Sequence, residues 1–192
     1  MLPLLPIDES ARLGEQLGIA DWFATANVSR GLLHSPTTAR AIYGVIDALI
    51  FRNTVASRTR ELVILRIGWR TASEYVFCQH VRYSRELGIP DEDILGVRDP
   101  EHSRAYSDTD RCVIALADEL HESARVSPAT WSALEKVLTH QELVELVLTA
   151  GFWRAIAGFN NAAKIQLEDG VPGWPEGRQP VAPTLSASSP RA

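Results

Sequence analysis

The sequence predicts an all-α protein made of one helical domain. Apolar residues recur at helical spacing along most of the chain, and no segment shows the convincing apolar–polar alternation of a half-buried strand. Capping residues, prolines and glycines stand where such helices would begin or end. The 192 residues suit one domain with a sizeable core, and 45% hydrophobic with 22% charged residues is an ordinary globular mixture.

Helix boundaries in the first half of the chain follow from its caps and breakers. Thr71 and Glu74 have the spacing of a capping box, so a helix is expected just after them. Gly88 ends that helix after about Leu87. Glu61–Trp69 is apolar on almost every side, which is typical of a buried helix. The other helices expected here are Asp8–Leu17, a helix capped by Thr37 that runs through Ile50, and Asp91–Val97.

The second half predicts three more helices and then a tail. Ser107 caps Asp108–Glu122, and Ser127 with Pro128 begins a helix that ends near Leu138. The last helix covers Gln141–Leu167, with Gly151 as a place where it could bend. Five of the eleven prolines fall in residues 171–192. We therefore expect one domain of seven or eight helices over residues 1–175 and a flexible Pro/Ser-rich tail over residues 176–192.

The charge balance and the N-terminus bear on partners and location. The net charge is −5, so there is no basic surplus for nucleic acid or an anionic membrane. MLPLLPIDES lacks the basic and apolar regions of a signal peptide, and the most apolar run, ELVILRIGW, is too short to cross a bilayer. We expect a cytoplasmic protein. Its two cysteines, Cys78 and Cys112, are expected to be free thiols.

One helix stripe collects the candidate functional side chains. On a helical wheel, Val76 and His80 fall within about 60° of Ser73, and the rest of this stripe is apolar. His80 is therefore expected to point into the protein. Cys78 lies about 140° from Ser73 and so is poorly placed to cooperate with His80.

A second buried polar residue is expected on the preceding helix. Glu61 lies among apolar residues, where a carboxylate is costly unless it is paired or protonated. A tight turn between the two helices would let Glu61 and His80 meet as a proton-transfer pair. The alternative is that both are satisfied core residues. A metal site is not expected, because Glu61 or Glu74 would give only two ligands with His80. We expect no cofactor.

At these residues the sequence resembles the carboxymuconolactone decarboxylase and alkylhydroperoxidase-D-like superfamily. The peroxidase branch carries Glu, eleven residues, Cys-x-x-Cys, three residues and His. This chain keeps the spacing from Glu61 to His80 but has Ser73 and Val76 in place of the two cysteines. The similarity covers residues 36–174, including RELVILRIGWRTASEYVFCQH, AYSDTDRCVIALADEL and a C-terminal helix with FNNA.

The resemblance implies a helical bundle of the alkylhydroperoxidase-D-like type, from the longer branch without the cysteine pair. It also implies a homo-oligomer (dimer, trimer or hexamer) with active sites near subunit contacts. Oligomerisation would explain why Glu61–Trp69 is apolar on all sides.

The loss of the cysteine pair favours acid–base chemistry. A serine hydroxyl cannot form a disulfide or reduce a peroxide, and Cys78 has no resolving partner at the required spacing. The decarboxylase branch also works without the cysteine pair. We expect a cofactor-independent decarboxylase, other lyase or isomerase for a small organic acid, lactone or related metabolite. Two alternatives stay open: a thiol peroxidase using Cys78, and a non-catalytic oligomeric protein that binds a small ligand.

Roles follow for the candidate residues. His80 would shuttle a proton and Glu61 would orient it. Ser73, Tyr75 and Val76 would contact the substrate, while Arg66 would hold a carboxylate across a subunit contact. Longer members without the cysteines often carry a second glutamate at the position of Val76. Its absence implies a more apolar pocket, an acid supplied from elsewhere, or lost catalysis.

Overall fold

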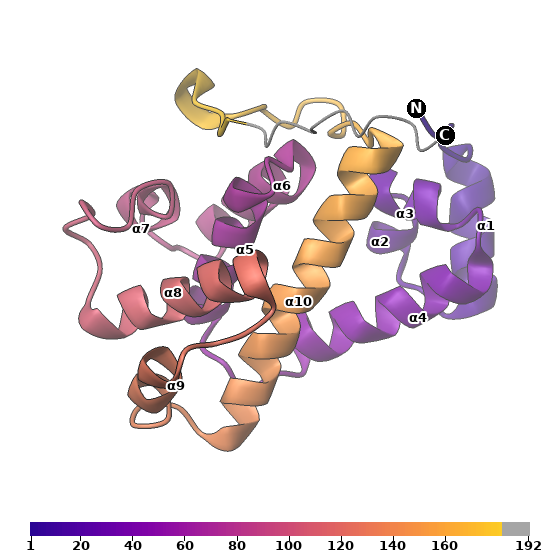
Figure 1. The fold of residues 1–192 in the computed structure, drawn as a ribbon. Coiled ribbons are helices and arrows are strands. Elements are labelled where there is room, and N and C mark those ends of the chain that lie inside the picture. Colours follow the sequence, from indigo (N-terminus) through magenta and orange to yellow (C-terminus); the bar gives the residue numbers. More distant parts are fainter. Residues whose placement is uncertain (182–192) are drawn as a thin grey trace, which may run out of the picture.

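The computed structural model describes residues 1–181 and confirms the all-α fold (Figure 1). These residues form ten α-helices, one π-helical turn and one 3₁₀ turn, and contain no strand. The elements are α1 Ile7–Leu17, α2 Asp21–Ala24, α3 Asn27–Leu32, α4 Pro36–Ile46, η1 Asp47–Phe51, α5 Ser57–Arg70, α6 Glu74–Glu86, α7 Asp91–Gly96, α8 Asp108–Ser123, α9 Pro128–Leu134, α10 His140–Ala163 and η2 Pro175–Gly177.

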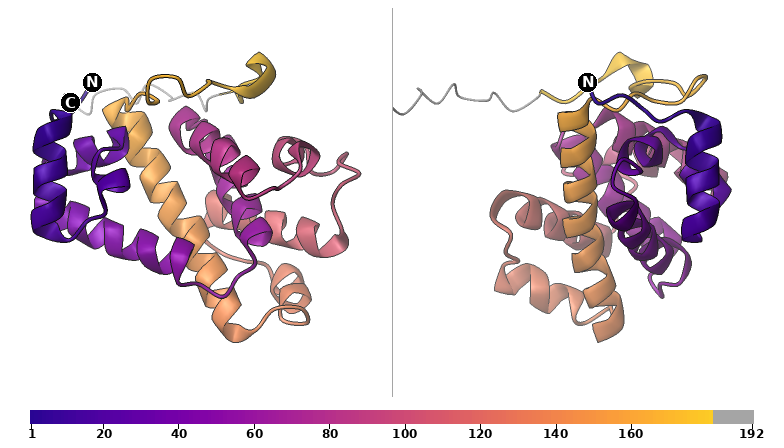
Figure 2. Two further views of the ribbon diagram at one scale, coloured as in Figure 1. Left: turned by 180° about the vertical axis from the view of Figure 1, so that it is seen from behind. Right: turned by 90° about the vertical axis from the view of Figure 1, so that its right-hand side faces the viewer.

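The long helix α10 runs through the middle of the molecule. Figures 1 and 2 show α1–α4 on one side of it and α5–α9 on the other. Helix α5 packs against α6, α8 and α10. Residues 60–68 of α5 are all buried by these neighbours. Its apolar character on every side is therefore explained within a single chain and needs no partner subunit. Homo-oligomerisation stays a prediction.

Close packing of α5 on α6 depends on Gly68. A Cβ atom at this position would lie 3.0 Å from the backbone nitrogen of Phe77, closer than side chains normally approach. The glycine therefore lets the two backbones come together, and this brings side chains of α5 against those of α6.

The predicted capping box at Thr71 and Glu74 is wrong. The Thr71 hydroxyl donates to the Ile67 carbonyl at 2.7 Å, so it completes the end of α5. Ala72 then takes a left-handed conformation (φ 49°), and α6 begins at Glu74 with Ser73 as its N-cap residue. The chain turns at Ala72, so the N-cap position falls on Ser73 and not on Thr71.

Other helix ends also differ from the expected ones. The α-helical part of the 37–50 segment ends at Ile46 and continues as the π-helical turn η1. Helix α9 ends at Leu134, and α10 crosses Gly151 without a break before ending at Ala163. Lys164 stops α10 because its φ is 57°, in the left-handed region. The short helices α2 and α3 were not predicted.

The N-terminal helices are tied to the end of α10. The Leu2 N–H donates to the Ala163 carbonyl at 2.9 Å. The Asn27 side chain donates to the Gln166 carbonyl at 3.1 Å, and its backbone N–H donates to the Glu168 carboxylate at 2.9 Å. These contacts hold α2 and α3 over the space between α6 and α10.

The chain after α10 packs back on the body. The Trp174 ring lies 5.2 Å from that of Phe77, and Glu176 pairs with Arg98 at 3.0 Å. The domain boundary at residue 175 stays a prediction, and residues 182–192 of the expected tail lie outside the described residues. Within residues 1–181, no helix is long and apolar enough to cross a membrane.

Candidate functional site

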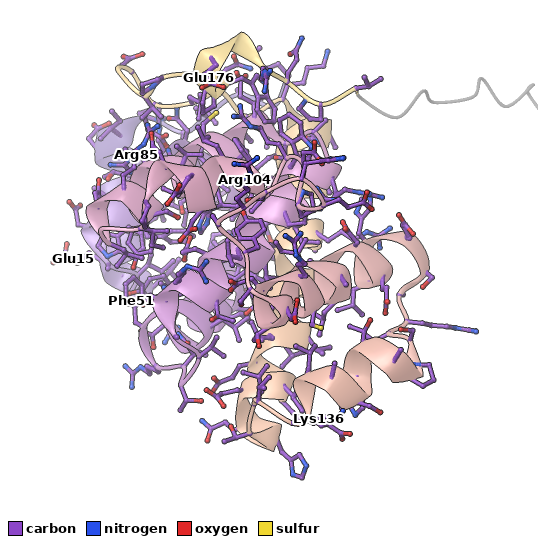
Figure 3. The ribbon with its side chains drawn as sticks, turned by 90° about the vertical axis from the view of Figure 1, so that its left-hand side faces the viewer. Glu15, Phe51, Arg85, Arg104, Lys136 and Glu176 are labelled. Carbon is purple, nitrogen blue, oxygen red and sulfur yellow. The ribbon has the colours of Figure 1, made fainter. Side chains whose placement is uncertain are left out.

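A cavity of about 560 Å³ lies between the N-terminal helices, α6 and α10. Side chains from α2, α3, α4, η1, α6 and α10 line it, and most of them are apolar. This volume and character are typical of a small-molecule site. At one edge Phe51 is 54% exposed. Figure 3 shows it on the same side of the molecule as Arg85, away from Lys136.

The π-helical turn η1 forms part of the cavity wall. Ile50 and Phe51 of this turn both line the cavity. Such turns are rare, cost stability, and occur often at functional sites. Here the wider turn places two large apolar side chains in succession along the wall.

Glu61 and His80 meet as the spacing of α5 and α6 predicted. His80 Nδ1 lies 2.7 Å from Glu61 Oε2. The Glu61 side chain is fully buried, whereas that of His80 is 16% exposed and lines the cavity. The pair therefore links a buried carboxylate to an imidazole that a ligand in the cavity can reach.

Trp153 determines which nitrogen of His80 carries the proton. The indole Nε1–H of Trp153 lies 2.9 Å from His80 Nε2. An indole N–H can only donate, so Nε2 accepts and carries no proton. The proton is then on Nδ1, which donates to Glu61. Nε2 is thus the basic nitrogen of His80, and Trp153 is its present partner.

Arg60 accompanies Glu61 in the buried part of the site. Its Nε lies 3.2 Å from Glu61 Oε1, and the arginine side chain is 4% exposed. A buried carboxylate without partners would cost several kcal/mol of desolvation. The guanidinium and the His80 N–H together satisfy both oxygens of Glu61.

A second polar group occupies another part of the cavity wall. The Glu168 carboxylate accepts from the Tyr75 hydroxyl at 2.5 Å and also from the Gln79 amide. Burial, and then the Glu168 charge, raise the pKa of Tyr75, so its phenol stays protonated and donates. Glu168 brings an acid to the cavity from outside the motif that contains Val76.

The predicted substrate-contacting residues divide into two groups. Tyr75 and Val76 line the cavity. Ser73 does not: it is fully buried, and its hydroxyl makes no hydrogen bond to the described part of the chain. Arg66 also lies elsewhere, because Asp118 binds its guanidinium at 2.7 and 2.9 Å. Its prediction as a carboxylate binder finds no support in this placement.

Cys78 packs in the core, away from the cavity. It is 3% exposed among residues such as Leu65 and Phe77. Burial, and then the Glu74 charge, raise the pKa of its thiol to about 12. The thiolate, which is the reactive form, is therefore scarce at neutral pH.

Slow alkylation of Cys78 is expected as a result. At pH 7.5 a thiol with this pKa is ionised to a fraction on the order of 10⁻⁵, so iodoacetamide should modify native Cys78 far more slowly than the unfolded chain. Mass spectrometry of the Cys78 peptide, with and without urea, measures the ratio. Equal rates in both states would contradict the burial described above.

No group of three or more His, Cys, Asp or Glu side chains within residues 1–181 is arranged to hold a metal ion. The prediction that the protein uses no metal or cofactor is unchanged by this finding.

Several residues of the site were not predicted from the sequence. Trp153, Asn160 and Glu168 line the cavity and come from α10 or just after it, and Arg60 pairs with the buried Glu61. A local signal existed for Asn160, since an amide side chain interrupts a mostly apolar stripe of α10. The sequence offered no comparable sign for the partner of His80.

Comparison with solved structures defines the fold. The chain is similar to a peroxidase-related protein from Ralstonia eutropha described as an alkylhydroperoxidase AhpD core, with 18% identity, a TM-score of 0.70, and coverage of 88% of this chain and 91% of the other. It is also similar to the debrominase Bmp8, solved in complex with 2,3,4-tribromopyrrole. The identity is 12%, the TM-score is 0.71, and the match covers 88% of this chain and 92% of the other. A peroxidase-related protein from Silicibacter sp. TM1040 is similar as well, with 13% identity, a TM-score of 0.68, and coverage of 88% of this chain and 91% of the other.

These likenesses show that the chain has the alkylhydroperoxidase-D-like fold, as the sequence resemblance implied. No protein-family model matches the chain, and no curated protein matches it either. Fold likeness at this identity leaves the reaction to be argued from the site itself.

Proposed function

We propose that the chain is a cofactor-independent acid–base enzyme acting on a small molecule held in this cavity. The reaction class is decarboxylation, another lyase reaction or isomerisation of an organic acid, lactone or related metabolite. The observation that carries the proposal is the buried Glu61 carboxylate bonded to His80, whose imidazole lines the cavity.

Proton abstraction next to a carbonyl group is the step that this arrangement supports. His80 Nε2 takes the proton, and the C–H electron pair moves into the carbonyl to form an enolate. Glu61 stabilises the resulting imidazolium through Nδ1–H. The imidazolium then returns the proton to another carbon in an isomerisation, or passes it to the β-leaving group that the enolate expels in an elimination. In a decarboxylation the C–C bond to the carboxylate breaks instead, CO₂ leaves, and a protonated His80 donates the proton that the resulting enolate takes up at carbon.

Tyr83 is suited to stabilise the enolate oxygen. It lines the cavity, and its ring lies edge-on to His80 with 6.3 Å between the ring centroids. Burial raises the pKa of Tyr83, so the phenol keeps its proton and can donate a hydrogen bond. Trp153 gives up its bond to His80 Nε2 when the acidic hydrogen of a ligand takes that place.

The alternatives have weaker support. A thiol peroxidase would need Cys78, which is buried outside the cavity with a raised thiol pKa. A non-catalytic ligand-binding protein agrees with one observation, since both nitrogens of His80 are already hydrogen bonded within the protein.

A substrate panel separates the three functions. The panel contains a β-keto acid (4-phenyl-3-oxobutanoate), an unsaturated lactone (α-angelica lactone), and cumene hydroperoxide with dithiothreitol. Chromatography with mass detection follows the wild-type chain and the variants His80→Ala, Glu61→Gln and Cys78→Ser. We expect turnover of a keto acid or lactone that is lost with His80→Ala and kept with Cys78→Ser. Peroxide turnover that disappears with Cys78→Ser would overturn the proposal.

A further inference from the structure

Asn160 is a buried polar side chain of the cavity that the proton-transfer pair does not use. It is 2% exposed and lines the cavity. Neither its Oδ1 nor its Nδ2 forms a hydrogen bond with any group in residues 1–181. Its backbone carbonyl accepts the N–H groups of Lys164 and Ile165 at the end of α10, so the side chain has no capping role.

The fold gains nothing from an amide at this position. A buried amide without partners costs free energy, and asparagine is a poor helix former. Leucine would satisfy the surrounding apolar wall better. A residue that goes against these local preferences and does not stabilise the fold is a candidate for function.

The position of Asn160 fixes a distance within the site. Trp153, which touches His80, and Asn160 are seven residues apart on α10 and both line the cavity. Seven residues of α-helix span about 10.5 Å. A ligand that reaches both His80 and Asn160 is therefore elongated, and its middle contacts apolar side chains such as Ile156.

The charges on the cavity wall disfavour an anionic group at the Asn160 end of a ligand. Of the described residues on its wall, Arg82 is the one with a permanent positive charge, whereas Glu86 and Glu168 are carboxylates. The Arg82 side chain is 56% exposed and is bonded to Glu86 and Gln79. A ligand carboxylate beside Asn160 would also leave Oδ1 unpaired, because a carboxylate only accepts.

We propose that Asn160 is a specificity-determining residue that binds a neutral ligand group with a donor and an acceptor side by side, namely a carboxamide or lactam. Asn160 Nδ2–H donates to the ligand carbonyl and Oδ1 accepts the ligand N–H. The inference rests on the proposed function only in placing the reacting end of the ligand at His80.

Calorimetric titration of the full chain at pH 7 tests this binding without any turnover. The probes are 4-phenylbutanamide, its isosteric methyl ketone 5-phenylpentan-2-one, which keeps the acceptor and lacks the donor, and 4-phenylbutanoate. The variant is Asn160→Leu. The matched control is Asn161→Leu, because Asn161 is exposed and its amide donates to the Thr71 carbonyl at 2.8 Å.

The wild-type chain and Asn161→Leu should bind the amide about tenfold more tightly than the ketone, with the carboxylate weakest. Asn160→Leu should lose this preference while its melting temperature rises, since an unpaired amide has been removed. The ratio of the amide and ketone affinities in the wild-type chain tests the proposal by itself, even if Asn160→Leu does not fold. Equal affinities, a tighter carboxylate, a preference kept in Asn160→Leu, or no binding of any probe would each refute the proposal.

The two proposals fail separately. If His80→Ala leaves turnover unchanged but the amide preference depends on Asn160, the proton-transfer function is wrong and the ligand class stands. If turnover depends on His80 but the amide binds no more tightly than the ketone, the proton-transfer function stands and the ligand class is wrong.

Discussion

Alanine at position 80 should lower kcat/KM for the panel substrate by about 10²- to 10⁴-fold, the usual contribution of a positioned general base. The methyl group cannot carry a proton and leaves Glu61 without the N–H that reaches it at 2.7 Å. Steady-state kinetics measures the loss, and added imidazole should restore part of the rate by entering the space left by the side chain. A purely structural histidine would show no such rescue.

Two comparisons sharpen this result. Glu61→Gln keeps the shape of the side chain but removes the charge that stabilises the imidazolium, so a loss of similar size is expected. His102→Ala changes an exposed histidine far from the cavity and should leave the rate unchanged. An unaltered rate in His80→Ala would contradict the account.

Methionine at position 60 should lower the free energy of unfolding by about 3–5 kcal/mol. Methionine keeps much of the apolar stem of Arg60 but removes the guanidinium from Glu61, which is fully buried. Glu61 then keeps the His80 N–H as a partner but has lost the positive charge that balances it in the core, and this is far more costly than the absence of the whole pair. Urea unfolding followed by circular dichroism measures the change.

The double variant and a surface control make this prediction specific. Arg60→Met with Glu61→Gln removes both charges and should be less destabilised than Arg60→Met alone. Arg82→Met removes a 56% exposed arginine and should change the free energy of unfolding by about 0.5 kcal/mol or less. If Arg60→Met has an effect no larger than Arg82→Met, the buried ion pair does not stabilise the site as described.

The parts of the fold that were predicted are those with long, regular patterns. Helices α8 and α10 have clear caps and several turns of apolar periodicity, so both could be predicted from the sequence. Helices α2 and α3 have four and six residues, too few to show a helical period. They nevertheless cover the cavity, and residues before position 36 were outside the expected core.

The site was predictable only where its residues are close in the sequence. Glu61 and His80 lie on consecutive helices joined by a tight turn, so the wheel and the turn together placed them in contact. Trp153 reaches His80 from 73 residues away, and no local pattern encodes that pairing. A helical wheel of α5 shows which side of the helix carries Arg66, but it could not show that Asp118 of α8 binds this arginine.

The central claim is that His80, supported by Glu61, transfers a proton to or from a cavity-bound ligand. The most direct measurement is deuterium exchange at the carbon next to the carbonyl, followed in both recovered substrate and product when the wild-type chain turns over its substrate in D₂O. The account predicts deuterium at that carbon, incorporated at a rate that falls with His80→Ala and does not change with Cys78→Ser. Absence of deuterium from both substrate and product, or the same incorporation rate in His80→Ala, would contradict it.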